Sequence, residues 1–256
     1  MPFCADLFFR VYDEGKKRYP FPMILLHGTA GSHLAWPREI RRLSGQQVIA
    51  LDLPGHGKPP GAACRSMNGL VDHLHQFVRK MGFYQVVLAG HSLGGALALN
   101  YALKYPKCIK GLLLLACGSY FYLLTSLFNT LRNPVKRYIA LETFNQIAFY
   151  ENFPQSKRRK ILEPFENMRA STILADLSIC SEFNLNGNLK NIDCPVGLIS
   201  GKADQIVAPL AVYQLFHALP TASISILPKC GHMLIHEETI LICRIISDFL
   251  TSVAAS

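Results

Sequence analysis

One short stretch carries residue types that could do nucleophilic chemistry. The run Gly90-His91-Ser92-Leu93-Gly94-Gly95 follows the apolar residues 86–89 and precedes a helical stretch rich in small residues. A serine flanked by glycines on a sharp strand-to-helix turn is typical of a nucleophile elbow, G-x-S-x-G. Because a serine hydroxyl is a weak nucleophile at neutral pH, Ser92 needs a base and a third group that orients the base.

Candidates for both groups follow other predicted strands. In an open parallel sheet, ligands bind at the carboxyl ends of the strands, so catalytic groups are expected there. Asp204 follows the apolar run 195–200, and His232 follows the predicted strand 223–227. With Ser92 they occur in the chain order Ser, Asp, His. We therefore predict that His232 accepts the proton of Ser92 and that Asp204 orients the imidazole.

Other residues compete for the roles of base and acid. Nine histidines are present, and His236, one helical turn beyond His232, is the alternative base. Asp176 and Asp193 are the alternative acids, although Asp193 resembles a turn residue before the next strand. The segment 117–119 after the preceding strand reads Cys-Gly-Ser and offers no carboxylate.

Two backbone N–H groups are expected to bind the oxyanion of the reaction. One belongs to Leu93, which lies at a helix N-terminus, where partial positive charge favours an anion. The other belongs to Thr29, in the glycine-containing loop 28–32. The residues expected to line the substrate pocket are Gly28, Trp36, Tyr120, Phe121 and Phe144, and core packing is the alternative role for Trp36.

Strands and helices alternate along the chain, which predicts a mostly parallel sheet flanked by helices. Strands are expected at 5–13, 22–27, 47–52, 86–89, 111–117, 195–200 and 223–227. Helices are expected from the 28–32 loop to 43, at 66–81 with Ser66 as the N-cap, from the elbow to 105, at 210–219 and at 237–253. His56, in the tight loop after the third strand, is expected to stabilise that turn.

The alternation is interrupted between residues 118 and 193. This block is helical in pattern, rich in aromatic residues and punctuated by Pro134, Pro154 and Pro164. We predict one α/β domain, formed by residues 1–117 and 194–256, with residues 118–193 inserted as a helical cap.

Five motifs resemble those of the α/β-hydrolase fold superfamily. They are LLHGTAGS (25–32), DLPGHG (52–57), GHSLGG (90–95), ISGKADQIVAP (199–209) and CGHMLIHEE (230–238). Within this fold the chain resembles the cap-bearing branch of serine esterases, thioesterases and carbon–carbon bond hydrolases. A core of this kind often begins with a two-strand hairpin. Only one clear strand precedes Met23, so we expect the hairpin to be truncated.

Composition restricts the partners and the compartment. The net charge is +9, but the basic residues are scattered, and the densest run is 157–160. We interpret this run as a solvated helix face, with a peripheral membrane contact as the alternative, and expect no nucleic-acid partner. The uncharged stretch 111–131 is interpreted as a strand and cap segment, not an integral membrane span.

No cofactor and no metal ion are predicted, because the chain has neither a dinucleotide fingerprint nor a cluster with metal-ligand spacing. The eight cysteines form no C-x-x-C pair, and the N-terminus lacks a secretory pattern, so we expect a cytoplasmic protein. The sequence indicates no particular oligomeric state.

A serine at position 92 favours acyl transfer to water. We expect a serine carboxylesterase-type hydrolase that acts on a small to medium lipophilic ester. Thioesterase, lactonase or carbon–carbon bond hydrolase activity on the same three residues is the alternative, and a non-catalytic ligand-binding protein is a further one.

Overall fold

The computed structural model describes residues 3–13, 15, 17–57, 61–121, 130–131, 133, 136–183 and 189–255. The described strands form one eight-stranded sheet in the order β1-β2-β4-β3-β5-β6-β7-β8. In this sheet order, β1–β2 and β2–β4 are antiparallel pairs, and every pair of neighbours from β4 onward is parallel. The strands are β1 (Phe3–Cys4), β2 (Leu7–Tyr12), β3 (Met23–Leu26), β4 (Val48–Leu51), β5 (Val86–His91), β6 (Ile109–Leu115), β7 (Val196–Gly201) and β8 (Ala222–Leu227).

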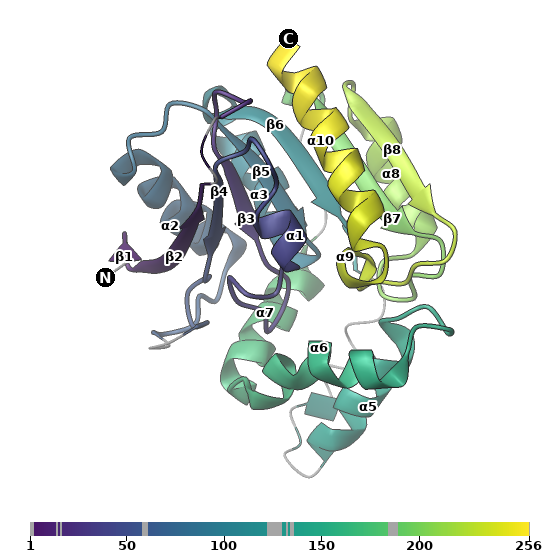
Figure 1. Ribbon diagram of the computed structural model, residues 1–256. Coiled ribbons are helices and arrows are strands. Elements are labelled where there is room, and N and C mark those ends of the chain that lie inside the picture. Colours follow the sequence, from purple (N-terminus) through teal and green to yellow (C-terminus); the bar gives the residue numbers. More distant parts are fainter. Residues whose placement is uncertain are drawn as a thin grey trace.

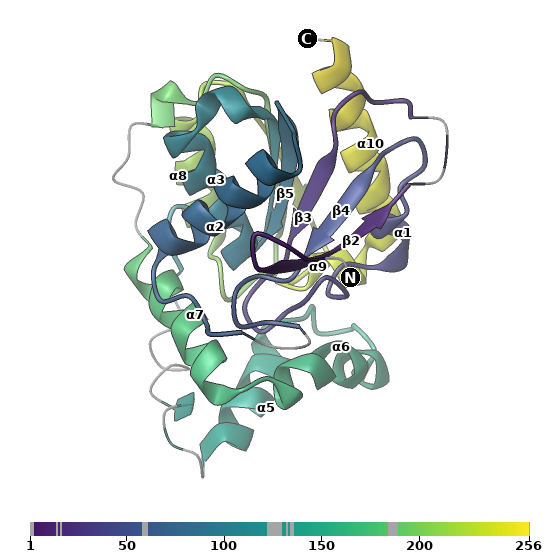
Figure 2. The same cartoon turned by 90° about the vertical axis from the view of Figure 1, so that its left-hand side faces the viewer.

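Helices cover both faces of the sheet (Figures 1 and 2). One face is covered by α1 and α10, and the other by α2, α3 and α8. The central strands are therefore continuous apolar runs, as expected for a parallel sheet that is buried on both sides. The helices are α1 (Arg38–Arg41), α2 (Met67–Lys80), α3 (Leu93–Lys104), η1 (Pro106–Cys108), α5 (Arg137–Ile147), α6 (Gln155–Asn167), α7 (Ala170–Glu182), η3 (Leu189–Asn191), α8 (Pro209–Ala218), α9 (Leu234–Glu237) and α10 (Thr239–Ala255).

The N-terminal hairpin is short but present, so the expectation of a single strand before Met23 is wrong. Phe3 pairs with Phe8 and Cys4 with Leu7, which makes β1 and β2 a hairpin. Its two turn residues, at positions 5 and 6, have φ values of 51° and 62°. A two-residue hairpin turn requires positive φ, which usually selects Asn or Gly. The sequence Ala-Asp lacks that signal, and the turn was therefore missed.

Two predicted helices differ from the structure. The stretch from the 28–32 loop to residue 43 forms only the four-residue α1, which begins after Pro37. The predicted helix 237–253 is divided into α9 and α10, which meet at Glu238. By contrast, α2 begins as predicted, because the Ser66 hydroxyl accepts a hydrogen bond from the Gly69 N–H at 3.1 Å.

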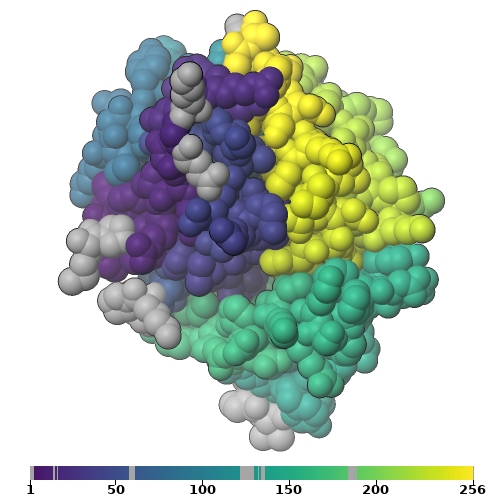
Figure 3. Space-filling view, viewed as in Figure 1, coloured from purple at the N-terminus to yellow at the C-terminus, as the bar shows by residue number. Residues whose placement is uncertain are grey.

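The helices α5, α6 and α7 come between β6 and β7 in the chain and lie together at the end of the sheet to which the parallel strands point (Figure 1). In the space-filling view this green segment lies against the blue-purple residues near α1 and the yellow residues near α9 (Figure 3). Pro154 precedes α6 as its N-cap, but Pro164 lies inside this helix and does not end it. Pro134 is outside the described residues, and the cap boundaries 118 and 193 stay predictions.

The basic run 157–160 is not a uniformly solvated face. Arg158 is buried, and its guanidinium donates to the carbonyls of Phe153, Tyr150 and Glu151 at 2.7–2.9 Å. It holds the segment before α6 in place, while its three neighbours are exposed.

Among the described helices, none combines the length and the apolar character that crossing a bilayer requires. Part of the uncharged stretch 111–131 is strand β6, and residues 122–129 lie outside the described part of the chain. The cytoplasmic location and a peripheral membrane contact stay predictions.

Candidate active site

Ser92 lies on a strained turn between β5 and α3. Its φ is 54° and its ψ is −117°, a conformation that non-glycine residues rarely adopt. The turn is possible because its neighbours lack side chains. A Cβ on Gly90 would overlap the Gly94 carbonyl, and a Cβ on Gly94 would overlap the Leu26 carbonyl. The predicted elbow is thus a tight turn that presents the Ser92 hydroxyl at the end of the sheet.

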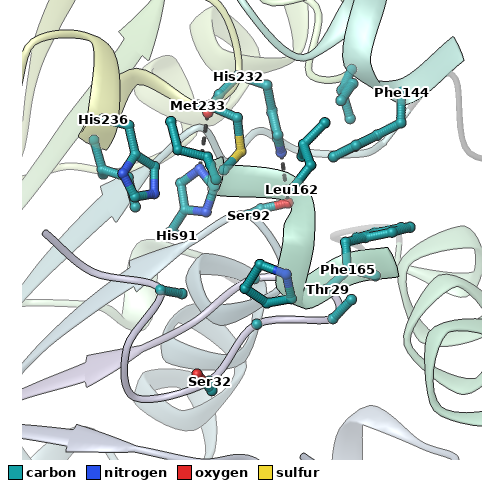
Figure 4. Close-up of a pocket in the computed structure, with 18 of the residues that line it drawn as sticks. Thr29, Ser32, His91, Ser92, Phe144, Leu162, Phe165, His232, Met233 and His236 are labelled. Carbon is teal, nitrogen blue, oxygen red and sulfur yellow. Dashed lines mark hydrogen bonds between the residues drawn. The ribbon is translucent and has the colours of Figure 1, made fainter. Parts of the chain in front are cut away.

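The three predicted catalytic side chains form one hydrogen-bonded chain. The Nε2 atom of His232 lies 2.9 Å from the Ser92 Oγ, and its Nδ1 atom lies 2.9 Å from Oδ2 of Asp204. All three residues are buried. Figure 4 shows the His232 ring directed at the Ser92 hydroxyl. This geometry allows His232 to accept the serine proton while Asp204 holds the ring tautomer.

The groups that flank this chain are held by buried hydrogen bonds. Oδ1 of Asp204 accepts from the N–H groups of Ile206 and Val207 at 2.8 and 2.9 Å, which leaves Oδ2 free for His232. The His91 Nε2 atom lies 2.9 Å from the His232 carbonyl oxygen (Figure 4). Burial, followed by the nearby His232, lowers the pKa of His91 to about 3. His91 is therefore neutral at pH 7 and donates through Nε2 to that carbonyl.

The two predicted oxyanion donors belong to segments next to Ser92. The Leu93 N–H is the first of α3, and Thr29 belongs to the loop after β3. This loop lies close to the elbow, because a Cβ on Gly28 would come within 3.2 Å of the Ser92 Cβ. Within the described part of the chain, neither N–H group is engaged in a hydrogen bond. Both are thus available to an oxygen bound beside Ser92.

A cavity of about 240 Å³ opens on Ser92 between the sheet and the helices α5, α6 and α7. Its wall is mostly apolar, with Phe144 from α5 and Leu162 and Phe165 from α6 (Figure 4). The rings of Phe144 and Phe165 stack with their centroids 5.0 Å apart. One charged side chain, Lys160, lies among the lining residues, and it is exposed. Of the pocket residues predicted, Gly28 and Phe144 line this cavity.

The other three predicted pocket residues do not appear among the lining residues. Trp36 is 1% exposed and belongs to the core under α1 and α10, with its ring against His91, so its assignment to the pocket is wrong. Tyr120 and Phe121 also lie outside the lining. The Phe121 ring packs on the Phe183 ring, with the centroids 5.5 Å apart. Nothing in the sequence around a single tryptophan distinguishes a side chain that lines the pocket from one that packs in the core under the sheet.

The competing histidine and aspartates take other positions. His236 lines the cavity wall, and burial lowers its pKa to about 4, but the imidazole bonded to Ser92 is that of His232. Asp193 is exposed. Asp176 is buried on α7 and contacts the 27–32 loop instead of His232.

A further carboxylate, which sequence reasoning missed, holds the His232 loop. Oε1 of Glu237 accepts from the Tyr150 N–H at 2.6 Å, and its Oε2 accepts from the Gly231 N–H at 2.8 Å. Burial raises the pKa of Glu237, whereas these two N–H groups lower it. The motif CGHMLIHEE contained this residue, but a contact to residue 150 has no local signal.

No group of three or more His, Cys, Asp or Glu side chains that could hold a metal ion occurs among the described residues. Cys180 lines the cavity, and Cys117 lies near the elbow helix; burial raises the pKa of both thiols, because it disfavours their charged form. The Cys117 thiol, for example, has a pKa of about 12.

Comparison with known proteins agrees with this architecture. The model of the alpha/beta hydrolase family matches residues 23–239, which is most of the chain. The chain belongs to the alpha/beta hydrolase family.

Relatives within this family differ in chemistry. A Bacillus subtilis protein with the provisional name 2-succinyl-6-hydroxy-2,4-cyclohexadiene-1-carboxylate synthase is 29% identical over 96% of this chain and 95% of its own. A monoacylglycerol lipase from Homo sapiens is 25% identical over 94% of this chain and 78% of its own. The enol-lactonase from Burkholderia xenovorans superimposes with a TM-score of 0.86, at 17% identity and 96% coverage of both chains. That last similarity concerns the fold alone.

Proposed function

We propose that this alpha/beta hydrolase cleaves a carboxyl ester of a small to medium lipophilic substrate through an acyl-enzyme intermediate. The observation that carries the proposal is the hydrogen-bonded chain from Asp204 through His232 to Ser92, which ends in a cavity with a mostly apolar wall. Its volume of about 240 Å³ is below the usual range for drug-sized ligands, which supports a small to medium substrate.

The reaction would proceed in two acyl-transfer steps. The Ser92 oxygen attacks the ester carbonyl carbon while His232 accepts the hydroxyl proton, and the N–H groups of Thr29 and Leu93 bind the oxyanion. Collapse of this intermediate breaks the bond to the alcohol, which leaves with the proton from His232. Water then attacks the acyl-enzyme with the same base, which releases the acid and restores Ser92.

Two alternatives use the same three residues. A thioester or a lactone would react by the same steps, and a carbon–carbon bond hydrolase would release a carbon leaving group. Lys160, among the lining residues, supports a substrate that carries a carboxylate, and the provisional name of the Bacillus subtilis relative contains one. The thioester, the lactone and a carboxylate-bearing ester form separate arms of the same assay.

The test is a panel of p-nitrophenyl esters from acetate to decanoate, with a thioester, a lactone and a carboxylate-bearing ester beside it. We expect turnover of the esters, with the shorter chains preferred, and covalent labelling by a fluorophosphonate. Ser92→Ala should abolish both, with a fall in kcat on the order of 10⁶-fold. Ser119→Ala is the matched control, because Ser119 follows the neighbouring strand and its hydroxyl bonds to Gln214.

The ester hypothesis fails if the wild-type protein neither turns over an ester nor reacts with the fluorophosphonate. Turnover of the thioester, lactone or carboxylate-bearing ester alone would identify the corresponding alternative. Equal turnover by the Ser92→Ala variant would remove Ser92 from the mechanism.

A further inference from the structure

Asp176 connects the cap helix α7 to the loop that carries Thr29. Its carboxylate is buried, and Oδ2 accepts a hydrogen bond from the Ala30 N–H at 3.0 Å. The same oxygen lies 2.9 Å from Nε2 of His56, which belongs to the loop after β4. One carboxylate oxygen therefore joins three segments that are far apart in the sequence.

The contacts of His56 determine its charge. Its Nε2 faces the Asp176 carboxylate, and its Nδ1 lies 3.2 Å from the Pro54 carbonyl oxygen. Both partners are acceptors, so these contacts favour the imidazolium form, in which both ring nitrogens carry a proton. Burial by itself would lower the pKa of His56, but Asp176 and the backbone carbonyls raise it above its ordinary value. The pair is thus a buried carboxylate and a buried imidazolium that neutralise one another.

His27 completes the support of the loop as a neutral imidazole. Its Nε2 accepts from the Leu53 N–H at 3.0 Å, so its Nδ1 carries the proton and donates to the Gly28 carbonyl at 2.7 Å. Burial, followed by the nearby His56, lowers the pKa of His27 to about 4, in agreement with this tautomer. The centroids of the His27 and His56 rings lie 4.7 Å apart.

These contacts fix the direction of the Thr29 N–H. The Gly28 carbonyl and the Thr29 N–H belong to one planar trans peptide group and point in opposite directions. The carbonyl is held by His27 and by the Gly31 N–H at 3.1 Å, and the peptide group that follows Thr29 is held through the Ala30 N–H. Ala30 has a φ of 57°, a left-handed conformation that costs a non-glycine residue free energy. The loop therefore needs an external contact to keep this shape.

The attachment of α7 does not itself depend on Asp176. Arg169 donates to the carbonyls of Gly61 and Gly55 at 2.7 and 3.3 Å, and the Thr172 hydroxyl donates to the Gly55 carbonyl at 3.4 Å. Removal of the Asp176 carboxylate should consequently loosen the 27–32 loop while the helix stays attached.

We propose that Asp176 is a positioning residue for the oxyanion hole, which anchors the Ala30 N–H to α7 and so keeps the Thr29 N–H directed at the reacting carbonyl oxygen. The His56 ring, bonded to the same oxygen, holds this carboxylate in place. The inference rests on the proposed function, because it requires an oxyanion beside Ser92. It gives the cap a role in the reaction in addition to covering the substrate.

The experiment compares the wild-type protein with the Asp176→Ala, Asp176→Asn and Glu182→Gln variants. Glu182 is an exposed carboxylate at the end of the same helix and serves as the matched control. Three quantities are measured: kcat and KM for a p-nitrophenyl ester, the inhibition constant of an aliphatic trifluoromethyl ketone, and hydrogen–deuterium exchange of the segment 27–32. The ketone forms a tetrahedral adduct whose oxyanion occupies the same site.

Asp176→Ala should lower kcat about 10- to 100-fold, since the Thr29 donor is misdirected and not removed, with KM little changed. The inhibition constant of the ketone should rise by the factor by which kcat/KM falls, and exchange at 27–32 should become faster. Asp176→Asn retains an acceptor for Ala30 but no charge opposite His56, so it should show a smaller change in the same direction. Glu182→Gln should match the wild type in all three measurements.

The proposal is wrong if a folded Asp176 variant raises KM without a fall in kcat, or if exchange at 27–32 stays as slow as in the wild type. Should Asp176→Ala fail to fold by circular dichroism, the Asp176→Asn variant decides by the same criteria. Absence of ester turnover in the wild type would instead overturn the proposed function, and hydrogen exchange would still show whether Asp176 anchors the loop.

Discussion

The carboxylate of Asp204 uses its two oxygens for two different purposes. One accepts two backbone N–H groups and fixes the side chain, and the other faces His232. Asp204→Asn should preserve much of this packing but remove the charge that orients and stabilises the imidazolium. We expect kcat to fall by roughly 10³- to 10⁴-fold with KM little changed. Steady-state kinetics on the preferred ester measures both.

Asp193→Asn is the control for this substitution, because Asp193 was the alternative acid and is exposed. It should have wild-type kcat. If Asp204→Asn retains near wild-type kcat, the assignment of the acid is incorrect.

At the scale of elements, the loop that carries His232 is fastened to the segment before α6. Glu237 at the end of α9 bridges the N–H groups of Gly231 and Tyr150, and the Met233 N–H donates to the Ala148 carbonyl at 2.9 Å. Glu237→Gln places an amide NH₂ opposite a backbone N–H, which leaves a partly buried donor without a partner. We expect a loss of about 1–3 kcal/mol in the free energy of unfolding, measured by urea denaturation, together with a lower kcat.

The neighbouring Glu238 is exposed, so Glu238→Gln is the matched control and should leave both quantities unchanged. Equal stability of the Glu237→Gln variant and the wild type would show that this bridge does not hold the loop.

At the scale of the whole molecule, buried neutral histidines make stability depend on pH. Burial is the main cause that lowers the pKa of His27 and His236 to about 4 and of His91 to about 3. In the unfolded chain each would have a pKa near 6.5, so as the pH falls the unfolded state binds these protons before the folded state does. Stability is therefore full above about pH 6.5 and falls as the pH drops toward the folded-state values.

Between pH 7.5 and 5, each of these histidines should remove up to about 2 kcal/mol from the free energy of unfolding. His56 acts in the opposite sense, since its raised pKa stabilises the fold below its unfolded value and loses that effect as the pH rises. Urea denaturation across this range measures the net slope. His236→Met should reduce the slope, whereas His217→Met, at an exposed position on α8, should not. A slope unchanged in the His236→Met variant would contradict this account.

Local patterns predicted the larger elements well. Continuous apolar runs identified the buried strands, because both faces of the sheet are covered, and Ser66 marked the start of α2. The errors lie where local propensity is weak. The hairpin turn at Ala5 and Asp6 lacks a glycine, α1 is a single turn, and Pro164 is tolerated inside α6.

The sequence by itself determined the order of strands and helices and the candidate nucleophile, base and acid. Each of these is announced by residues close together in the chain, such as the glycines that permit the Ser92 turn. Tertiary structure decided what only packing between distant segments can decide. It placed Trp36 in the core and Phe144 in the cavity wall. It also brought the carboxylates of Asp176 and Glu237 to backbone N–H groups of two loops. A hydrogen bond between residues 30 and 176 depends on how helix and sheet pack, and no local spacing encodes it.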